Sequence, residues 1–115
     1  MARSNKPIVW GLFAAGGTIA AFVVPALILI TCLAVPLGLL PADILSYEHV
    51  LGLVQHPFSK LVTFALLFMI IWHAAHRMRI TAHDLGIRND TVITLICYGV
   101  AAAGSLLLLL ALLKI

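Results

Sequence analysis

A long stretch without any charged side chain, from Trp10 to Leu40, constrains the fold of this chain more than any other feature. A helix of about 20 apolar residues is already long enough to cross the hydrocarbon core of a bilayer. The whole chain of 115 residues is 63% apolar and only 10% charged, whereas an ordinary soluble domain is roughly 45–50% apolar and about 25% charged. The sequence therefore predicts an integral membrane protein.

The apolar residues fall into three segments, which predict an all-α fold with three transmembrane helices in one membrane-anchor domain, residues 1–115. We expect the spans at about 9–39, 59–85 and 91–113. Pro25 removes a backbone donor near the middle of the first span, and Pro36, Gly38 and Pro41 favour its end. The second span is expected to continue past its apolar part as a polar cytoplasmic extension as far as Gly86, a typical C-terminal cap.

The positions of lysine and arginine predict the orientation of the chain, because cytoplasmic loops carry an excess of these residues. The cations assigned to the cytoplasmic side are Arg3, Lys6, Arg77, Arg79 and Arg88. The opposite side has only Lys60 and Lys114. We therefore expect a cytoplasmic N-terminus and a periplasmic C-terminus.

The first loop has the pattern of a short interfacial helix. Ser46 can cap this helix, and Glu48 falls in its first turn. Its apolar side chains share one face, so we expect the helix to lie on the outer surface of the membrane.

Several classes of function lack the motifs that they require. The sequence has no C-x-x-C pair, no Gly-rich phosphate loop and no H-E-x-x-H run, so a self-contained enzyme is not expected. The net charge of +3 comes without a basic run, which excludes a nucleic-acid interface. A small multidrug or cation antiporter is an alternative by size, but it needs a carboxylate within a span, and all four acidic residues lie outside the apolar segments.

Ionisable side chains deep in the second span are the candidates for chemistry. At 1.5 Å per residue from Leu61, His73 lies about 18 Å into the membrane, His76 about 22 Å and Arg77 about 24 Å. Trp10 reaches the same depth if the first two spans are neighbours. An indole N–H, an imidazole and a guanidinium at one depth suit a flat ligand with a carbonyl edge, such as a quinone.

Each of these residues also has a structural explanation. Arg77 can extend its guanidinium to the lipid headgroups, and His73 can pack with one ring nitrogen hydrogen-bonded. Trp72 fits an aromatic belt at the membrane interface. His73 or His76 could also ligate haem, but a second axial histidine would have to come from a partner, because the first and third spans contain none.

Five runs of residues together resemble the D subunit of bacterial fumarate reductase, and the resemblance covers nearly the whole chain. The runs are Trp10-Gly11-Leu12-Phe13 with Gly16-Gly17, Pro36-Leu37-Gly38-Leu39 with Pro41, Leu45-Ser46-Tyr47-Glu48, His76-Arg77-Met78, and His83-Asp84-Leu85. The order and spacing of the loop run and the histidine-arginine run are the specific part of this likeness.

The resemblance implies a non-catalytic anchor in the bacterial inner membrane. Its partners would be a flavoprotein subunit with FAD, an iron–sulfur subunit with the clusters, and the second membrane anchor, the C subunit. The complex would oxidise menaquinol in anaerobic respiration, and the resemblance assigns quinone binding to Trp10, His76 and Arg77. No haem is expected, although a histidine at position 73 departs from the family pattern and keeps a haem-binding cytochrome b-type anchor of a succinate dehydrogenase as the alternative.

Overall fold

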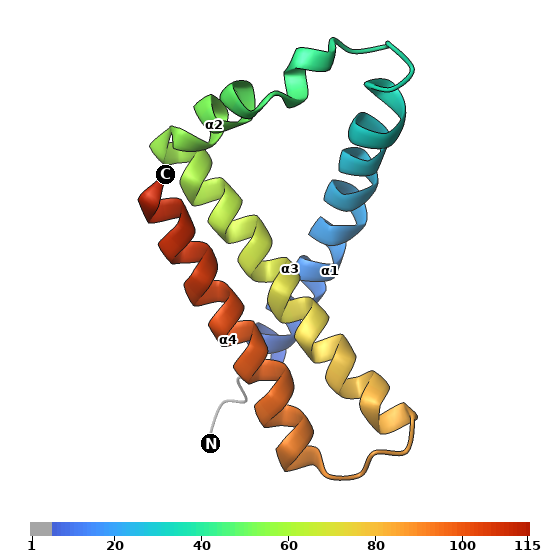
Figure 1. The fold of residues 1–115 in the computed structure, drawn as a ribbon. Coiled ribbons are helices and arrows are strands. Elements are labelled where there is room, and N and C mark those ends of the chain that lie inside the picture. The colour runs from blue at the N-terminus through green and yellow to red at the C-terminus, as the bar shows by residue number, and fades with distance from the viewer. Residues whose placement is uncertain (1–5) are drawn as a thin grey trace.

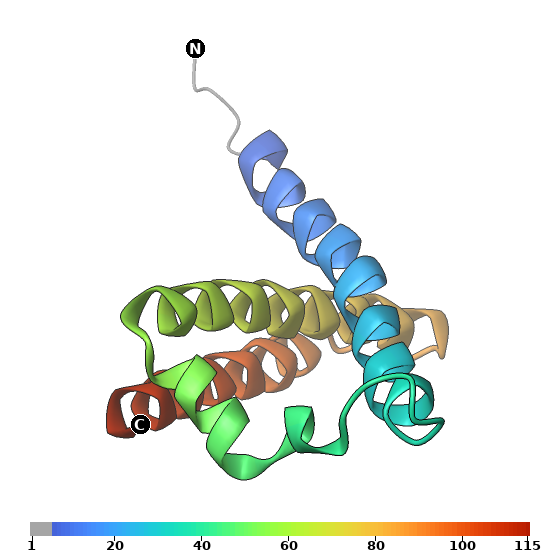
Figure 2. The same cartoon turned by 90° about the horizontal axis from the view of Figure 1, so that it is seen from above.

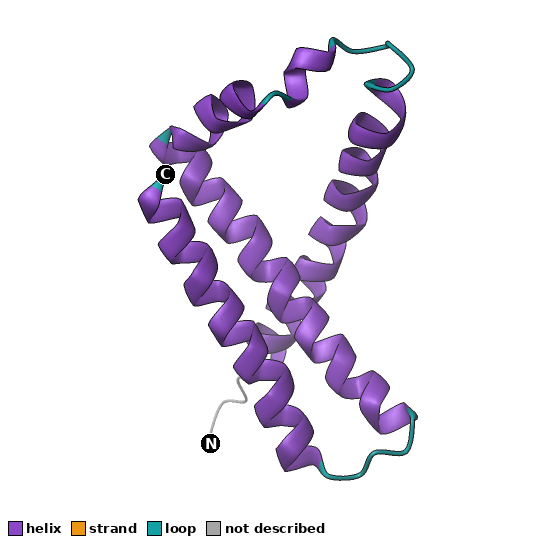
Figure 3. Ribbon diagram, in the orientation of Figure 1, coloured by secondary structure: helices purple, strands orange, loops and turns teal. Residues whose placement is uncertain are grey.

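The computed structural model describes residues 6–115, and this part of the chain is helical with no strand (Figures 1 and 3). Three helices are long and apolar enough to cross a membrane, which confirms the predicted fold class. They are α1, Lys6–Ile28, which continues as a π-helical segment, Leu29–Ala34; α3, Pro57–Asp84; and α4, Asp90–Lys114. A 3₁₀ turn, Ala42–Leu45, and the short helix α2, Tyr47–Gln55, lie between α1 and α3.

The helices α3 and α4 form an antiparallel hairpin, and α1 crosses this hairpin at a steep angle (Figures 1 and 2). The end of α1, the whole of α2, the start of α3 and the C-terminus lie at one end of the molecule, as Figure 1 shows. The start of α1 and the turn between α3 and α4 lie toward the other end. The chain therefore runs between the two ends of the molecule three times, as three membrane spans require.

Capping residues set the helix boundaries. Ser46 accepts a hydrogen bond from the His49 N–H at 3.3 Å, which confirms the predicted start of the interfacial helix. Gly86 has a φ of +88°, and its N–H donates to the His83 carbonyl at 2.9 Å, while the next N–H, of Ile87, reaches the Ala82 carbonyl. These two bonds form a Schellman motif, so Gly86 ends the second span as predicted.

The first span ends earlier than the predicted residue 39. Its helix stops at Ala34, and turns follow as far as Gly38, whose φ is +73°. The last helical turns are π-helical, with the Val35 N–H donating five residues back to Ile30. The helix continues through Pro25, so the irregularity lies after the proline rather than at it.

The contact between α1 and α3 depends on two glycines of α1. A Cβ atom at Gly16 would lie 2.5 Å from the Met69 carbonyl oxygen, and one at Gly17 would lie 2.5 Å from His73 Cε1. At Gly16 the neighbour is backbone, so glycine is required there for this close approach, whereas at Gly17 a side chain would require the His73 ring or α1 to move. Between α3 and α4 the small residues Ala101 and Ser105 are buried in the same way.

Candidate functional site

A cavity of about 910 Å³ lies between the first turns of α1 and the middle of α3, and α4 contributes one wall. This volume is in the range of pockets that hold drug-sized molecules. Its walls are mostly apolar and aromatic, and the ring side chains among its lining residues are Trp10, Phe13, Phe68, Trp72, His73, His76 and Tyr98. The cavity therefore suits a flat ring system that needs a few polar contacts at its edge.

His76 lies in this cavity with one side of its ring engaged. Its Nδ1 is 2.7 Å from the Tyr98 hydroxyl of α4, and the Phe13 ring of α1 lies 4.4 Å from its centroid at 59°. All three helices thus contribute to the immediate surroundings of this imidazole. The other ring nitrogen, Nε2, is the one that remains for a ligand.

His73 has a different role, because α1 covers it. Its Nδ1 lies 2.9 Å from the Phe13 carbonyl oxygen, and its ring stacks on the Phe13 ring at 4.5 Å and 14°. Its Nε2 lies only 3.1 Å from where a Cβ of Gly17 would be. The prediction that His73 packs with one ring nitrogen hydrogen-bonded is confirmed.

Trp72 of α3 packs against α4. Its indole N–H donates to the Ser105 hydroxyl at 3.1 Å, and its ring stacks against Tyr98 at 5.8 Å and 19°. Ser105 in turn donates to the Ala101 carbonyl at 2.8 Å. The indole N–H is therefore satisfied by Ser105 of the neighbouring helix, a contact that the sequence did not indicate.

The structure brings Trp10 and His76 to one cavity but leaves Arg77 outside it. Trp10 lines the cavity from α1 and is still 68% exposed. Arg77 follows His76 on α3, and the turn of the helix points it away from the cavity to an exposed position. Within residues 6–115 its guanidinium forms no hydrogen bond or ion pair.

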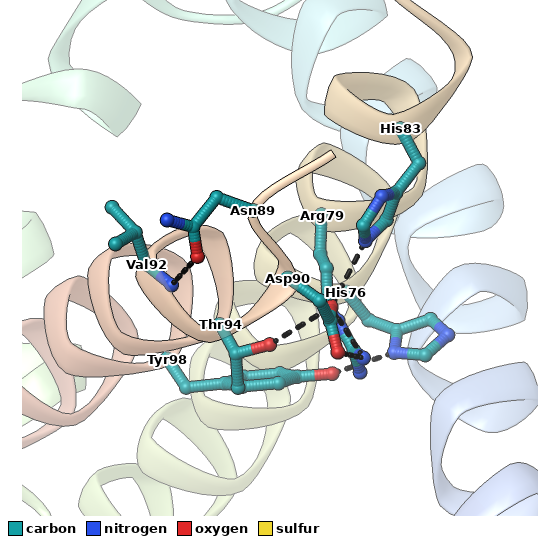
Figure 4. A network of polar contacts seen from close by, with 8 residues as sticks. All are labelled: His76, Arg79, His83, Asn89, Asp90, Val92, Thr94 and Tyr98. Atoms are coloured by element: carbon teal, nitrogen blue, oxygen red, sulfur yellow. Dashed lines mark hydrogen bonds and ion pairs between the residues drawn. The ribbon is translucent and has the colours of Figure 1, made fainter. Parts of the chain in front are cut away.

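A polar cluster joins the cavity to the turn between α3 and α4 (Figure 4). Arg79 donates two hydrogen bonds to the Asp90 carboxylate, from Nε at 2.9 Å and from Nη2 at 2.8 Å. The same carboxylate lies 2.9 Å from His83 Nε2 and accepts from the Thr94 hydroxyl at 3.2 Å. This cluster was not predicted, because only the close pairing of the two helix ends brings Asp90 to Arg79.

The described residues offer little to a metal ion. No three histidine, cysteine, aspartate or glutamate side chains gather in residues 6–115. Cys32 and Cys97 are free cysteines, one exposed and one partly covered. The lining of the cavity consists of aromatic surface and single hydrogen-bonding groups.

Comparisons with known proteins agree on one family. The family model for the D subunit of fumarate reductase matches residues 1–113. The chain is 44% identical over 99 residues to the fumarate reductase D subunit of Photobacterium profundum, covering 86% of this chain and 82% of that one. It is 46% identical over 105 residues to the D subunit of Mycobacterium bovis, with 90% and 82% covered. For the D subunit of Aliivibrio fischeri the identity is 37% over 105 residues, with 91% and 88% covered.

Proposed function

Because the chain belongs to the family of fumarate reductase D subunits, we propose that it anchors the enzyme and helps to build its menaquinol oxidation site. Together with a second membrane anchor, the C subunit, it holds the flavoprotein and iron–sulfur subunits at the bacterial inner membrane. It binds no FAD, cluster or haem of its own. Family membership favours this anchor role over the antiporter alternative.

The observation that carries the site assignment is the cavity in which Trp10 and His76 meet. A naphthoquinol has a flat fused ring system with one oxygen at each end, and it needs aromatic walls and a few hydrogen-bonding groups. The cavity has both, because Trp10, Phe13, Trp72 and Tyr98 supply rings and His76 supplies a polar nitrogen. Its volume of about 910 Å³ leaves room for such a ring.

Each assigned residue has a separate task. Oxidation of a quinol releases two protons and two electrons, and the electrons leave through the clusters of the iron–sulfur partner. His76 holds a ring oxygen through the ring nitrogen that Tyr98 leaves free, and so orients the oxygen from which a proton leaves. Trp10 packs on the ring face and offers its indole N–H. Arg77 lies outside the cavity, and because it cannot lose its proton, it is suited to stabilising negative charge on a ligand oxygen from beside the cavity.

Orientation is part of the same proposal. The soluble redox subunits bind on the cytoplasmic side, so the cavity must lie near that face of the membrane. The cavity includes the first turns of α1, and the N-terminal end of α1 carries Lys6. An N-terminus in the cytoplasm and a C-terminus in the periplasm place both the cavity and Lys6 near the cytoplasmic face.

The experiment that tests the site replaces His76 with leucine in the complete complex of four subunits. Leucine keeps the apolar span and removes the nitrogen that meets the quinol. We expect the complex to assemble and to reduce fumarate normally with an artificial soluble donor, while menaquinol oxidation slows by about tenfold or more, which corresponds to roughly 1.4 kcal/mol.

His49→Leu is the matched control. It makes the same chemical change at His49, which is exposed on α2 at the far end of the molecule. It should leave both activities unchanged. Normal menaquinol oxidation by His76→Leu would overturn the site assignment. An equal loss of both activities with loss of the assembled complex would make His76 structural instead.

A further inference from the structure

The Tyr98 hydroxyl of α4 lies 2.7 Å from His76 Nδ1, beside the cavity that both residues line. We propose that Tyr98 is a positioning residue that fixes the His76 imidazole, so that its Nε2–H is presented to a ring oxygen of the ligand. This inference rests on the proposed function. It adds to the proposed function the His76 Nε2–H as the donor by which the site recognises an oxygen acceptor.

The direction of the hydrogen bond follows from what surrounds the Tyr98 hydroxyl. A phenol has one hydrogen to donate and two lone pairs to accept with. The guanidinium of Arg79 interacts with this hydroxyl, and arginine has donors only. The Tyr98 oxygen is thus on the accepting side toward Arg79. Its hydrogen is left for His76 Nδ1, the acceptor that the described residues place within 2.7 Å.

Arg79 is itself held in place by Asp90. Two hydrogen bonds of 2.9 and 2.8 Å tie it to Asp90, in the planar geometry that an arginine–carboxylate pair prefers. His83 and Thr94 hold the same carboxylate from the other side. A single line of donors and acceptors therefore runs from the helix turn to the cavity.

The consequence for His76 is a choice of tautomer. When Nδ1 accepts a hydrogen bond, the neutral ring carries its hydrogen on Nε2. In Figure 4 this second nitrogen points away from Tyr98 and toward the ribbon of α1, the side on which the cavity lies. The ring is also confined by Phe13, so its orientation is set on two sides. The site thereby offers a donor to a ligand oxygen such as a quinone carbonyl.

The test is a double-mutant cycle in the complete complex, using His76→Leu and Tyr98→Phe singly and together. Phenylalanine removes one oxygen and keeps the ring that stacks on Trp72. We expect Tyr98→Phe to raise the KM for menaquinol by about threefold to tenfold and to leave fumarate reduction with an artificial donor intact. In the His76→Leu background the same change should have no further effect, because a residue that acts through His76 has nothing left to position.

Tyr47→Phe is the matched control, since Tyr47 is 76% exposed on α2, far from the cavity. An unchanged KM in Tyr98→Phe would overturn the proposal. So would an equal loss in both backgrounds, or failure of Tyr98→Phe to assemble, because the hydroxyl would then act independently of His76. If His76→Leu itself has no effect, the proposed quinol site fails instead.

A second measurement needs no change at Tyr98. Nitrogen NMR of the complex with ¹⁵N-histidine in this chain reports which ring nitrogen bears the hydrogen, and the signal lost in His76→Leu identifies residue 76. At a pH where the ring is neutral, we expect the hydrogen on Nε2. A hydrogen on Nδ1 would overturn the proposal whatever the kinetics show.

Discussion

At the scale of single residues, Arg77 differs from its neighbour Arg79. Arg79 binds Asp90, whereas Arg77 is exposed and has no hydrogen-bond or ion-pair partner among residues 6–115. If Arg77 completes the quinol site from beside the cavity, Arg77→Leu should leave the complex assembled and slow menaquinol oxidation by about tenfold. Steady-state rates with menaquinol and with an artificial donor check this expectation.

Arg88→Leu is the control for that change, because Arg88 is another exposed arginine and lies in the turn before α4. It should leave both rates as they are. If Arg77→Leu behaves like Arg88→Leu, Arg77 serves to place its charge among the lipid headgroups, and the quinol site must be assigned without it.

The sequence predicted only some of the residues that line the cavity. Trp10 and His76 stand out because polar or ionisable groups at membrane depth are rare. Phe13 and Tyr98 do not, since aromatic residues are common in membrane helices. Their roles depend on the angle at which α1 crosses α3 and on the register of α4, which periodicity does not determine.

At the scale of the elements, the crossing of α1 and α3 is the contact most sensitive to change. In Gly17→Ala the new Cβ would lie 2.5 Å from His73 Cε1, so the His73 ring or α1 must move. If α1 moves, Phe13 and Trp10 move with it, and we expect a lower thermal midpoint of the assembled complex together with a raised KM for menaquinol. Thermal unfolding followed with quinol kinetics measures both.

Gly11→Ala provides the comparison within the same helix, because a Cβ at Gly11 meets nothing within 4 Å in this chain. It should leave the thermal midpoint and the KM close to those of the wild type. A Gly17→Ala complex that also behaves as wild type would contradict the close approach that the structure describes.

Helix boundaries were predictable wherever a capping signal is local. Ser46 and Gly86 were recognised because their bonds reach only three to five residues along the chain. The start of α3 was placed at Ser59, but the helix begins at Pro57, capped by the His56 side chain at 3.2 Å from the Phe58 N–H. Histidine is not a usual cap. The end of the first span was placed too late, because residues 35–39 are apolar whether or not they are helical.

At the scale of the whole molecule, three traverses place the α3–α4 turn opposite α2 and the C-terminus. We expect a reporter fused after Arg88 to be cytoplasmic and reporters after Glu48 or Ile115 to be periplasmic. Arg3, one of the cations behind this expectation, lies outside the described residues. The two periplasmic fusions serve as controls for each other. The reverse pattern would place the cavity on the side of the membrane opposite to the one that the proposed function requires.

The close crossing of α1 and α3 at Gly16 and Gly17 divides α1 into two parts. The first turns of α1, before the two glycines, line the cavity, and the rest of α1 lies beyond the crossing. The segment from residue 35 to residue 56 joins the far end of α1 to the start of α3, so this segment and the cavity lie on opposite sides of the crossing.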